Sequence, residues 1–161
     1  IATAINDGAI TLDQTVYCEN GLWWYGGRYL HDHHPYGVLT FENVVAKSSN
    51  IGTAKAARQL GMGRLSHTIT NFGFGAVTRL PLPGESAGVI HPTNKWSKIS
   101  ITRIPIGHEV SATPLQMCLA MARHGADIVA APPVDQIVPR LAAGRRVIGN
   151  LVGGEPSRLA Q

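Results

Sequence analysis

The chain has few cysteines, few charged residues and no long apolar run. Its two cysteines, Cys18 and Cys118, lie a hundred positions apart, so they form neither a CxxC pair nor a zinc-finger spacing. Only 15% of the 161 residues are charged, and no cluster of five basic residues accompanies the net charge of +4. That pattern predicts a mildly basic surface and no nucleic-acid partner. No apolar run is long enough to cross a bilayer.

Glycine, proline and apolar residues are abundant instead. Hydrophobic residues make up 44% of the chain, with 18 glycines and 10 prolines, which is typical of a globular domain of many short elements. Thr40 and Thr113 have the position of helix N-caps, and Gly8 and Gly61 have that of helix ends. The predicted helices span residues 1–8, 40–47, 51–60, 63–71 and 113–125. Residues 11–37 are predicted to be loop with short strands, and 134–138 a weak strand.

The tripeptide Ser48-Ser49-Asn50 therefore falls between two predicted helices. Its simplest interpretation is helix capping, with Asn50 as the N-cap of the helix that starts at Ile51. A junction can also direct side chains into a cleft, where a regular helix would bury them. By itself the tripeptide favours helix capping. The segments that follow it in the chain favour an active site instead, and the two interpretations are compatible.

Several short segments follow this junction in order. They are Phe72-Gly73-Phe74-Gly75, Pro83-Gly84-Glu85 with Gly88, Trp96-Ser97, Ile106-Gly107 and Thr113-Pro114-Leu115-Gln116. In this order and spacing, the chain from Ile1 to about Val138 resembles the transpeptidase domain of class B penicillin-binding proteins, cell-wall cross-linking enzymes that β-lactams acylate. Ser48 to Asn50 match the family's Ser-x-Asn element, the middle of its three active-site motifs.

The resemblance implies a fold and a role for each motif residue. The fold is mainly α, the helical part of the α+β penicillin-binding transpeptidase and serine β-lactamase-like fold, with most of the central sheet missing. Ser48 would relay or stabilise a proton near the nucleophile, and Asn50 would bind substrate by donating its amide to a carbonyl. The Ser-x-x-Lys and Lys-Thr-Gly motifs do not occur in the 161 residues. We therefore expect residues 1–161 to be the partial domain between those motifs, and to be inactive alone.

For the parent protein, the resemblance implies a peptidoglycan D,D-transpeptidase that works through an acyl-serine intermediate and needs no cofactor. Its partners would be stem peptides, β-lactams and divisome or elongasome membrane proteins. It would lie on the outer side of the inner membrane, held by an anchor upstream of these residues. A non-catalytic sensor domain of the same fold that binds β-lactam or peptidoglycan is the alternative. The cut domain would expose an apolar face and either associate with a second copy or be marginally stable.

Other features have competing interpretations. The stretch His31-Asp32-His33-His34 has the residue types of a metal site, but adjacent ligands rarely converge on one ion, so we favour a polar surface loop and assign no metal. Trp23-Trp24-Tyr25 suits either a sugar-stacking platform or, as we favour, aromatic packing over a loop. Cys118 is expected in the apolar series of its helix. Glu85 matches the family and is expected to serve the fold.

One departure from the family stands out. The chain has Gly107-His108-Glu109 where family members often have glycine at the third position. Because of this substitution, the resemblance does not predict the backbone conformation at Glu109. The Ser-x-Asn element is not affected.

Overall fold

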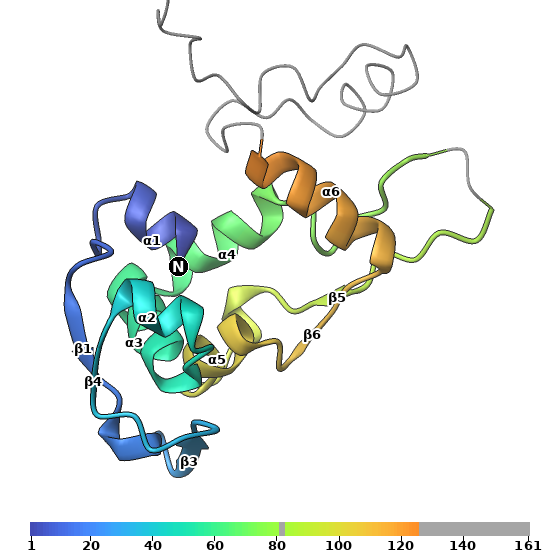
Figure 1. The fold of residues 1–161 in the computed structure, drawn as a ribbon. Coiled ribbons are helices and arrows are strands. Elements are labelled where there is room, and N and C mark those ends of the chain that lie inside the picture. The colour runs from blue at the N-terminus through green and yellow to red at the C-terminus, as the bar shows by residue number, and fades with distance from the viewer. Residues whose placement is uncertain (81–82, 126–161) are drawn as a thin grey trace, which may run out of the picture. The chain divides into compact units, whose positions relative to one another are not determined.

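The computed structural model describes residues 1–80 and 83–125, and the expected helices form within them (Figure 1). The helices are α1 (Ala2–Asn6), α2 (Phe41–Ala46), α3 (Asn50–Leu60), α4 (Met62–Asn71), α5 (Ser100–Arg103) and α6 (Pro114–Gly125). Short 3-10 helices add η1 (Glu19–Gly21), η2 (Thr93–Lys95) and η3 (Ile104–Ile106). None of the helices described is long and apolar enough to span a membrane. The strand predicted at 134–138 lies outside the described residues.

The strands form three separate antiparallel pairs. They are β1 (Thr15–Tyr17) with β4 (Val38–Thr40), β2 (Leu22–Tyr25) with β3 (Arg28–His31), and β5 (Val89–Ile90) with β6 (Val110–Ser111). In the part of the chain that the structure describes, no larger sheet is present. This arrangement confirms the prediction of a mainly helical domain with little of a central sheet.

The described residues divide into two compact units. The first comprises Ile1–Asn71 and Val89–Ser111, and the second comprises Phe72–Gly88 with the described part of Ala112–Gln161. The core of the first unit gathers around α3, whose Ile51 and Ala54 are fully buried beside Phe41 and Val44 of α2. The apolar stripe of α3 thus faces the core, as its spacing predicts.

Side-chain and glycine caps set the helix ends of the first unit. The Thr40 hydroxyl accepts the Asn43 N–H at 3.2 Å and begins α2. Gly8 (φ 67°) follows the end of α1, and Gly61 (φ 87°) ends α3. These conformations are easily reached only by glycine, so both ends are confirmed as predicted.

The Thr-Pro-Leu-Gln segment builds the second unit. The Gln116 N–H donates to Thr113 Oγ1 at 3.2 Å, and the Thr113 N–H donates to Gln116 Oε1 at 2.9 Å, which is a reciprocal capping box at the start of α6. Gln116 Nε2 also donates to the carbonyl oxygens of Ala76 and Ala87, at 2.8 and 2.9 Å. The buried Gln116 therefore ties the loop 76–87 to α6.

Cys118 is exposed, so the prediction that it is a small core residue was wrong. The buried face of α6 carries Gln116, Leu119 and Ala120. That i, i+3, i+4 set points in a different direction from Cys118. The buried face differs from the predicted one because the polar side chain of Gln116 turns inward to make three hydrogen bonds. A pattern of apolar residues gives no indication of a buried polar side chain.

Glu85 of the Pro-Gly-Glu segment holds a turn of the same loop. Its two carboxylate oxygens accept the backbone N–H groups of Thr78, at 2.5 Å, and Arg79, at 3.1 Å. Arg79 has a φ of 63°, so the carboxylate stabilises a turn that a non-glycine residue adopts at a cost. Hydrogen bonding to Thr78 lowers the pKa of Glu85. The expectation that this residue serves the fold agrees with these contacts.

We expect Glu85→Gln to lower the melting temperature at pH 7, because an amide offers a single acceptor oxygen to two N–H groups. A carboxylate whose pKa is lower in the folded state stabilises the fold above its unfolded pKa. That contribution disappears as the pH falls through the folded value. The difference between wild type and variant should therefore narrow in thermal melts at pH 3. A gap that is as wide at pH 3 as at pH 7 would contradict the role of the charge.

Candidate functional site

Ser48 ends α2 in a glycine-like conformation. Its N–H donates to the Val45 carbonyl at 3.1 Å, and the next N–H, of Ser49, donates to the Val44 carbonyl at 3.0 Å. These two bonds form a Schellman motif, in which the residue at the position of Ser48 is usually glycine. Ser48 reaches it with a φ of 55°. A serine in this conformation costs of order 1–3 kcal/mol, which the surrounding hydrogen bonds must offset.

The N-cap of α3 is Ser49, so the prediction that Asn50 caps this helix was wrong. Ser49 Oγ accepts the Gly52 N–H at 3.0 Å, and Ser49 is 1% exposed. Its backbone is extended, whereas Asn50 is already the first helical residue. The physical reason is that the turn between the two helices is short. Ser49 is therefore both the last residue of the Schellman motif of α2 and the N-cap of α3.

Asn50 is consequently free of capping and points to the end of β3. Its Nδ2 donates to the His31 carbonyl oxygen at 2.9 Å. An amide nitrogen carries two hydrogens, so one N–H remains for another acceptor. Ser48 is exposed, and its hydroxyl has no hydrogen-bond partner within residues 1–80 and 83–125. The structure therefore brings together at one turn an exposed hydroxyl and an oriented amide, the two side chains that the sequence selects.

Asp32 is the residue of this site that the sequence did not reveal. Its Oδ2 accepts the Ser49 hydroxyl at 2.7 Å, and its Oδ1 accepts the Ile51 N–H at 2.9 Å. The only signal was its place in a polar stretch, which suggested a metal ligand. Within the described residues, no three His, Cys, Asp or Glu side chains are grouped to hold a metal ion.

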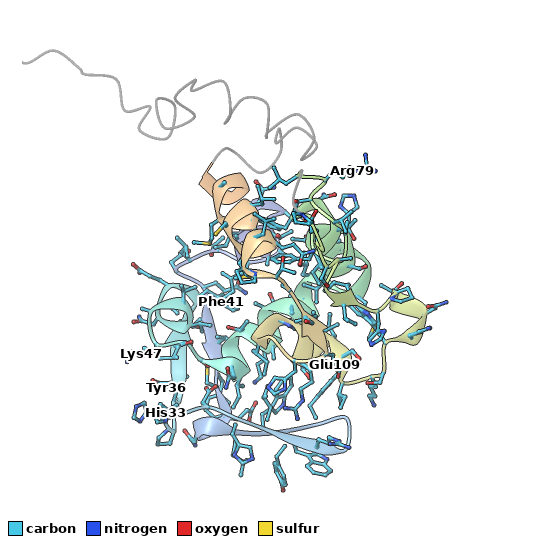
Figure 2. The ribbon with its side chains drawn as sticks, turned by 90° about the vertical axis from the view of Figure 1, so that its right-hand side faces the viewer. His33, Tyr36, Phe41, Lys47, Arg79 and Glu109 are labelled. Carbon is cyan, nitrogen blue, oxygen red and sulfur yellow. The ribbon has the colours of Figure 1, made fainter. Side chains whose placement is uncertain are left out.

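The other residues of the polar stretch lie at the edge of the first unit. Figure 2 shows His33, Tyr36 and Lys47 along that edge. His33 stacks on His34 with ring centroids 4.6 Å apart, and Lys47 Nζ lies 5.5 Å from the centre of the Tyr36 ring. All but Tyr36 are exposed, which is the polar surface loop that the sequence favours.

The aromatic residues of β2 alternate between two faces. Trp23 packs against the core and stacks on Tyr25 at 5.0 Å, and the Arg58 guanidinium lies 4.7 Å from the Tyr25 ring. This confirms aromatic packing for Trp23 and Tyr25. Trp24 faces the other way, 58% exposed, with its ring 4.7 Å from that of Tyr29.

Glu109 adopts a left-handed backbone conformation, which favours glycine. Its φ is 62°, and its Oε2 accepts the hydroxyl of the buried Ser100 at 2.6 Å. The sequence did not predict the backbone conformation at Glu109. In the structure, the hydrogen bond between the Glu109 carboxylate and the Ser100 hydroxyl compensates for the strained turn.

Cys18 lies under the site. It is fully buried, and the Ser49 hydroxyl is 3.4 Å from its sulfur. Burial raises the pKa of the Cys18 thiol, so the group stays protonated near neutral pH. A protonated, inaccessible thiol is a poor nucleophile, which leaves Cys18 a packing residue beneath the turn.

Comparison with known proteins agrees with this fold. The family model described as the penicillin-binding protein transpeptidase domain matches residues 1–133. PbpB of Mycolicibacterium smegmatis is 35% identical over 134 residues, which are 82% of this chain and 20% of the relative. The peptidoglycan D,D-transpeptidase FtsI of Escherichia coli K12 is 34% identical over 62% of this chain and 17% of its own length. The chain thus spans about a fifth of the curated relatives it matches.

A solved structure supports the same assignment. Penicillin-binding protein 3 of Mycobacterium tuberculosis, in complex with aztreonam, superposes with a TM-score of 0.70 at 35% identity, over 77% of this chain and 29% of that one. The fold is therefore the helical part of a penicillin-binding transpeptidase domain. The chain belongs to the penicillin-binding protein transpeptidase family.

Proposed function

We propose that residues 1–161 are the middle part of a peptidoglycan D,D-transpeptidase, between its Ser-x-x-Lys and Lys-Thr-Gly motifs. The observation that carries this proposal is Ser48, an exposed serine in the left-handed conformation where a helix end ordinarily has glycine. Strain of this kind is concentrated at functional sites. Membership of the transpeptidase family suggests a role for the Ser48 hydroxyl in proton transfer, whereas helix capping would leave this exposed hydroxyl without a role.

In the proposed reaction, a serine of the Ser-x-x-Lys motif attacks the carbonyl of the penultimate D-alanine of a stem peptide. The terminal D-alanine leaves with a proton, and an amine of a neighbouring stem then takes the acyl group from the serine. Ser48 would pass or stabilise the proton near the nucleophile and its lysine. Asn50 would donate its remaining N–H to the substrate carbonyl while its other N–H stays on His31.

The location and partners follow from the same proposal. A transpeptidase acts on peptidoglycan outside the cytoplasmic membrane, so the parent protein would hold this domain on the periplasmic side, among divisome or elongasome proteins. Aztreonam is bound by the related penicillin-binding protein 3, which supports β-lactam binding here. In the isolated chain, exposed apolar residues such as Val38 (65%) and Val45 (57%) support self-association.

Labelling with a fluorescent penicillin tests the proposal. The full-length protein should be labelled covalently, and peptide mass spectrometry should place the label on the serine of a Ser-x-x-Lys motif. The isolated 161 residues should remain unlabelled, because loss of the nucleophile costs about six orders of magnitude in rate in a serine enzyme. Label on Ser48, or on the isolated chain, would refute the assignment of roles.

A second measurement separates the enzyme from a sensor domain of the same fold. Release of D-alanine from a D-Ala-D-Ala peptide in the presence of an acceptor amine should accompany labelling of the full-length protein. Penicillin binding without any such turnover would favour the sensor.

A further inference from the structure

We propose that Asp32 is a positioning residue for the acylation step, acting by fixing the direction of the Ser48 and Asn50 side chains. The inference rests on the proposed function, because it concerns the same motif. It starts from a contact between segments 17 residues apart: the end of β3 reaches the turn between α2 and α3 through Asp32.

The Asp32 carboxylate uses both of its oxygens on this turn. Oδ2 accepts the Ser49 hydroxyl at 2.7 Å and Oδ1 accepts the Ile51 N–H at 2.9 Å. The two donors flank Asn50 in the sequence. A carboxylate offers a separate acceptor oxygen to each of these two donors, whereas the amide of asparagine has one acceptor oxygen and a donor group in place of the other.

His31, the last residue of β3, binds the same turn through its backbone. The His31 carbonyl accepts Asn50 Nδ2 at 2.9 Å, so three successive residues of the turn, Ser49, Asn50 and Ile51, are bound to two successive residues of the strand end. Ser49 itself is buried and caps α3. The side chain of Asn50 therefore cannot rotate without breaking a bond that Asp32 helps to align.

The strain at Ser48 makes this hold necessary. With a φ of 55°, Ser48 is less stable in its conformation than a glycine would be, and the backbone would relax to a less strained conformation if its surroundings did not hold it. The bonds of Asp32 to Ser49 and Ile51 begin one residue beyond Ser48. They oppose that relaxation and keep the hydroxyl of Ser48 at its exposed position.

The test compares Asp32→Asn with Glu19→Gln in the full-length protein. Both replace a carboxylate by an amide; Glu19 pairs with Lys55 further along α3 and does not contact the motif. In Asp32→Asn an N–H group faces the Ser49 hydroxyl, which must turn toward Cys18. We expect a ten- to hundredfold loss in the second-order rate constant of acylation by penicillin, the scale of a misplacement of about 1 Å. Glu19→Gln should acylate at the wild-type rate.

The labelled fraction separates positioning from a merely structural effect. Positioning predicts that nearly all of the Asp32→Asn protein is labelled, more slowly. Partial unfolding predicts a smaller labelled fraction at the wild-type rate constant, and that result would overturn the inference, as would an unchanged rate. If Asp32→Asn yields no soluble protein, Ser49→Ala takes its place in the test. This variant removes the other partner of the 2.7 Å hydrogen bond and should slow acylation as well. Wild-type protein that is never labelled would refute the proposed function itself.

Discussion

Ser48→Gly in the full-length protein is expected to raise stability and to lower acylation. Glycine reaches a φ of 55° without the cost that serine incurs, so the end of α2 should gain up to about 1 kcal/mol, less the greater freedom of glycine in the unfolded chain. Loss of a hydroxyl that takes part in proton transfer should reduce the acylation rate constant by about 10²- to 10⁴-fold. Thermal melts and penicillin-labelling kinetics measure the two effects on the same sample.

Ser48→Ala is the matched control. Alanine has the same strain as serine at this φ and lacks the hydroxyl, so it should lose the same activity without the gain in stability. A Ser48→Gly variant that acylates as fast as wild type would show that the serine has no part in the reaction. Higher stability together with slower acylation in Ser48→Gly would mean that the serine lowers the stability of the fold and raises the rate of the reaction.

The helix ends that the sequence predicted are those with a local chemical signal. Thr40, Gly61 and Thr113 each act within one turn of their own position, through a hydroxyl or a left-handed backbone, so their roles are visible in the sequence. Boundaries at these residues agree with the structure to within one or two residues. The family resemblance added the expectation of a small sheet content, which periodicity alone would not give.

The residues that the sequence misplaced depend on partners far along the chain. Asp32 reaches Ser49 across 17 residues, and Gln116 reaches Ala76 across 40. No local pattern indicates such a contact, so the sequence predicted only a polar surface loop around Asp32 and, from an apolar series, a buried Cys118. At Ser48 the usual glycine signal of a helix end is absent, and the proposed role of its hydroxyl would account for the serine. That is where a functional site is expected to break a local rule.

Gly52→Ala is expected to destabilise the first unit, although alanine is the better helix former. A Cβ at position 52 would lie 2.4 and 2.8 Å from the two Cγ atoms of Val44, which is fully buried. Overpacking of this kind costs about 1–3 kcal/mol, while the helix propensity of alanine returns about 1 kcal/mol. We expect a net loss of up to about 2 kcal/mol in urea denaturation of the isolated chain. In the full-length protein we expect slower acylation, since α2 and α3 would separate at the turn that carries Ser48.

Gly63→Ala and Val44→Ala make this prediction specific to the contact between α2 and α3. A Cβ at Gly63 of α4 meets nothing within 4 Å, so that variant should be neutral or stabilising by up to about 1 kcal/mol. Val44→Ala removes the methyl groups that block Gly52→Ala. The double variant should therefore lose less stability than the sum of the single variants, by a coupling of about 0.5–3 kcal/mol. Strict additivity would show that Gly52 does not set the approach of the two helices, and that the Ser-x-Asn turn is held by its hydrogen bonds alone.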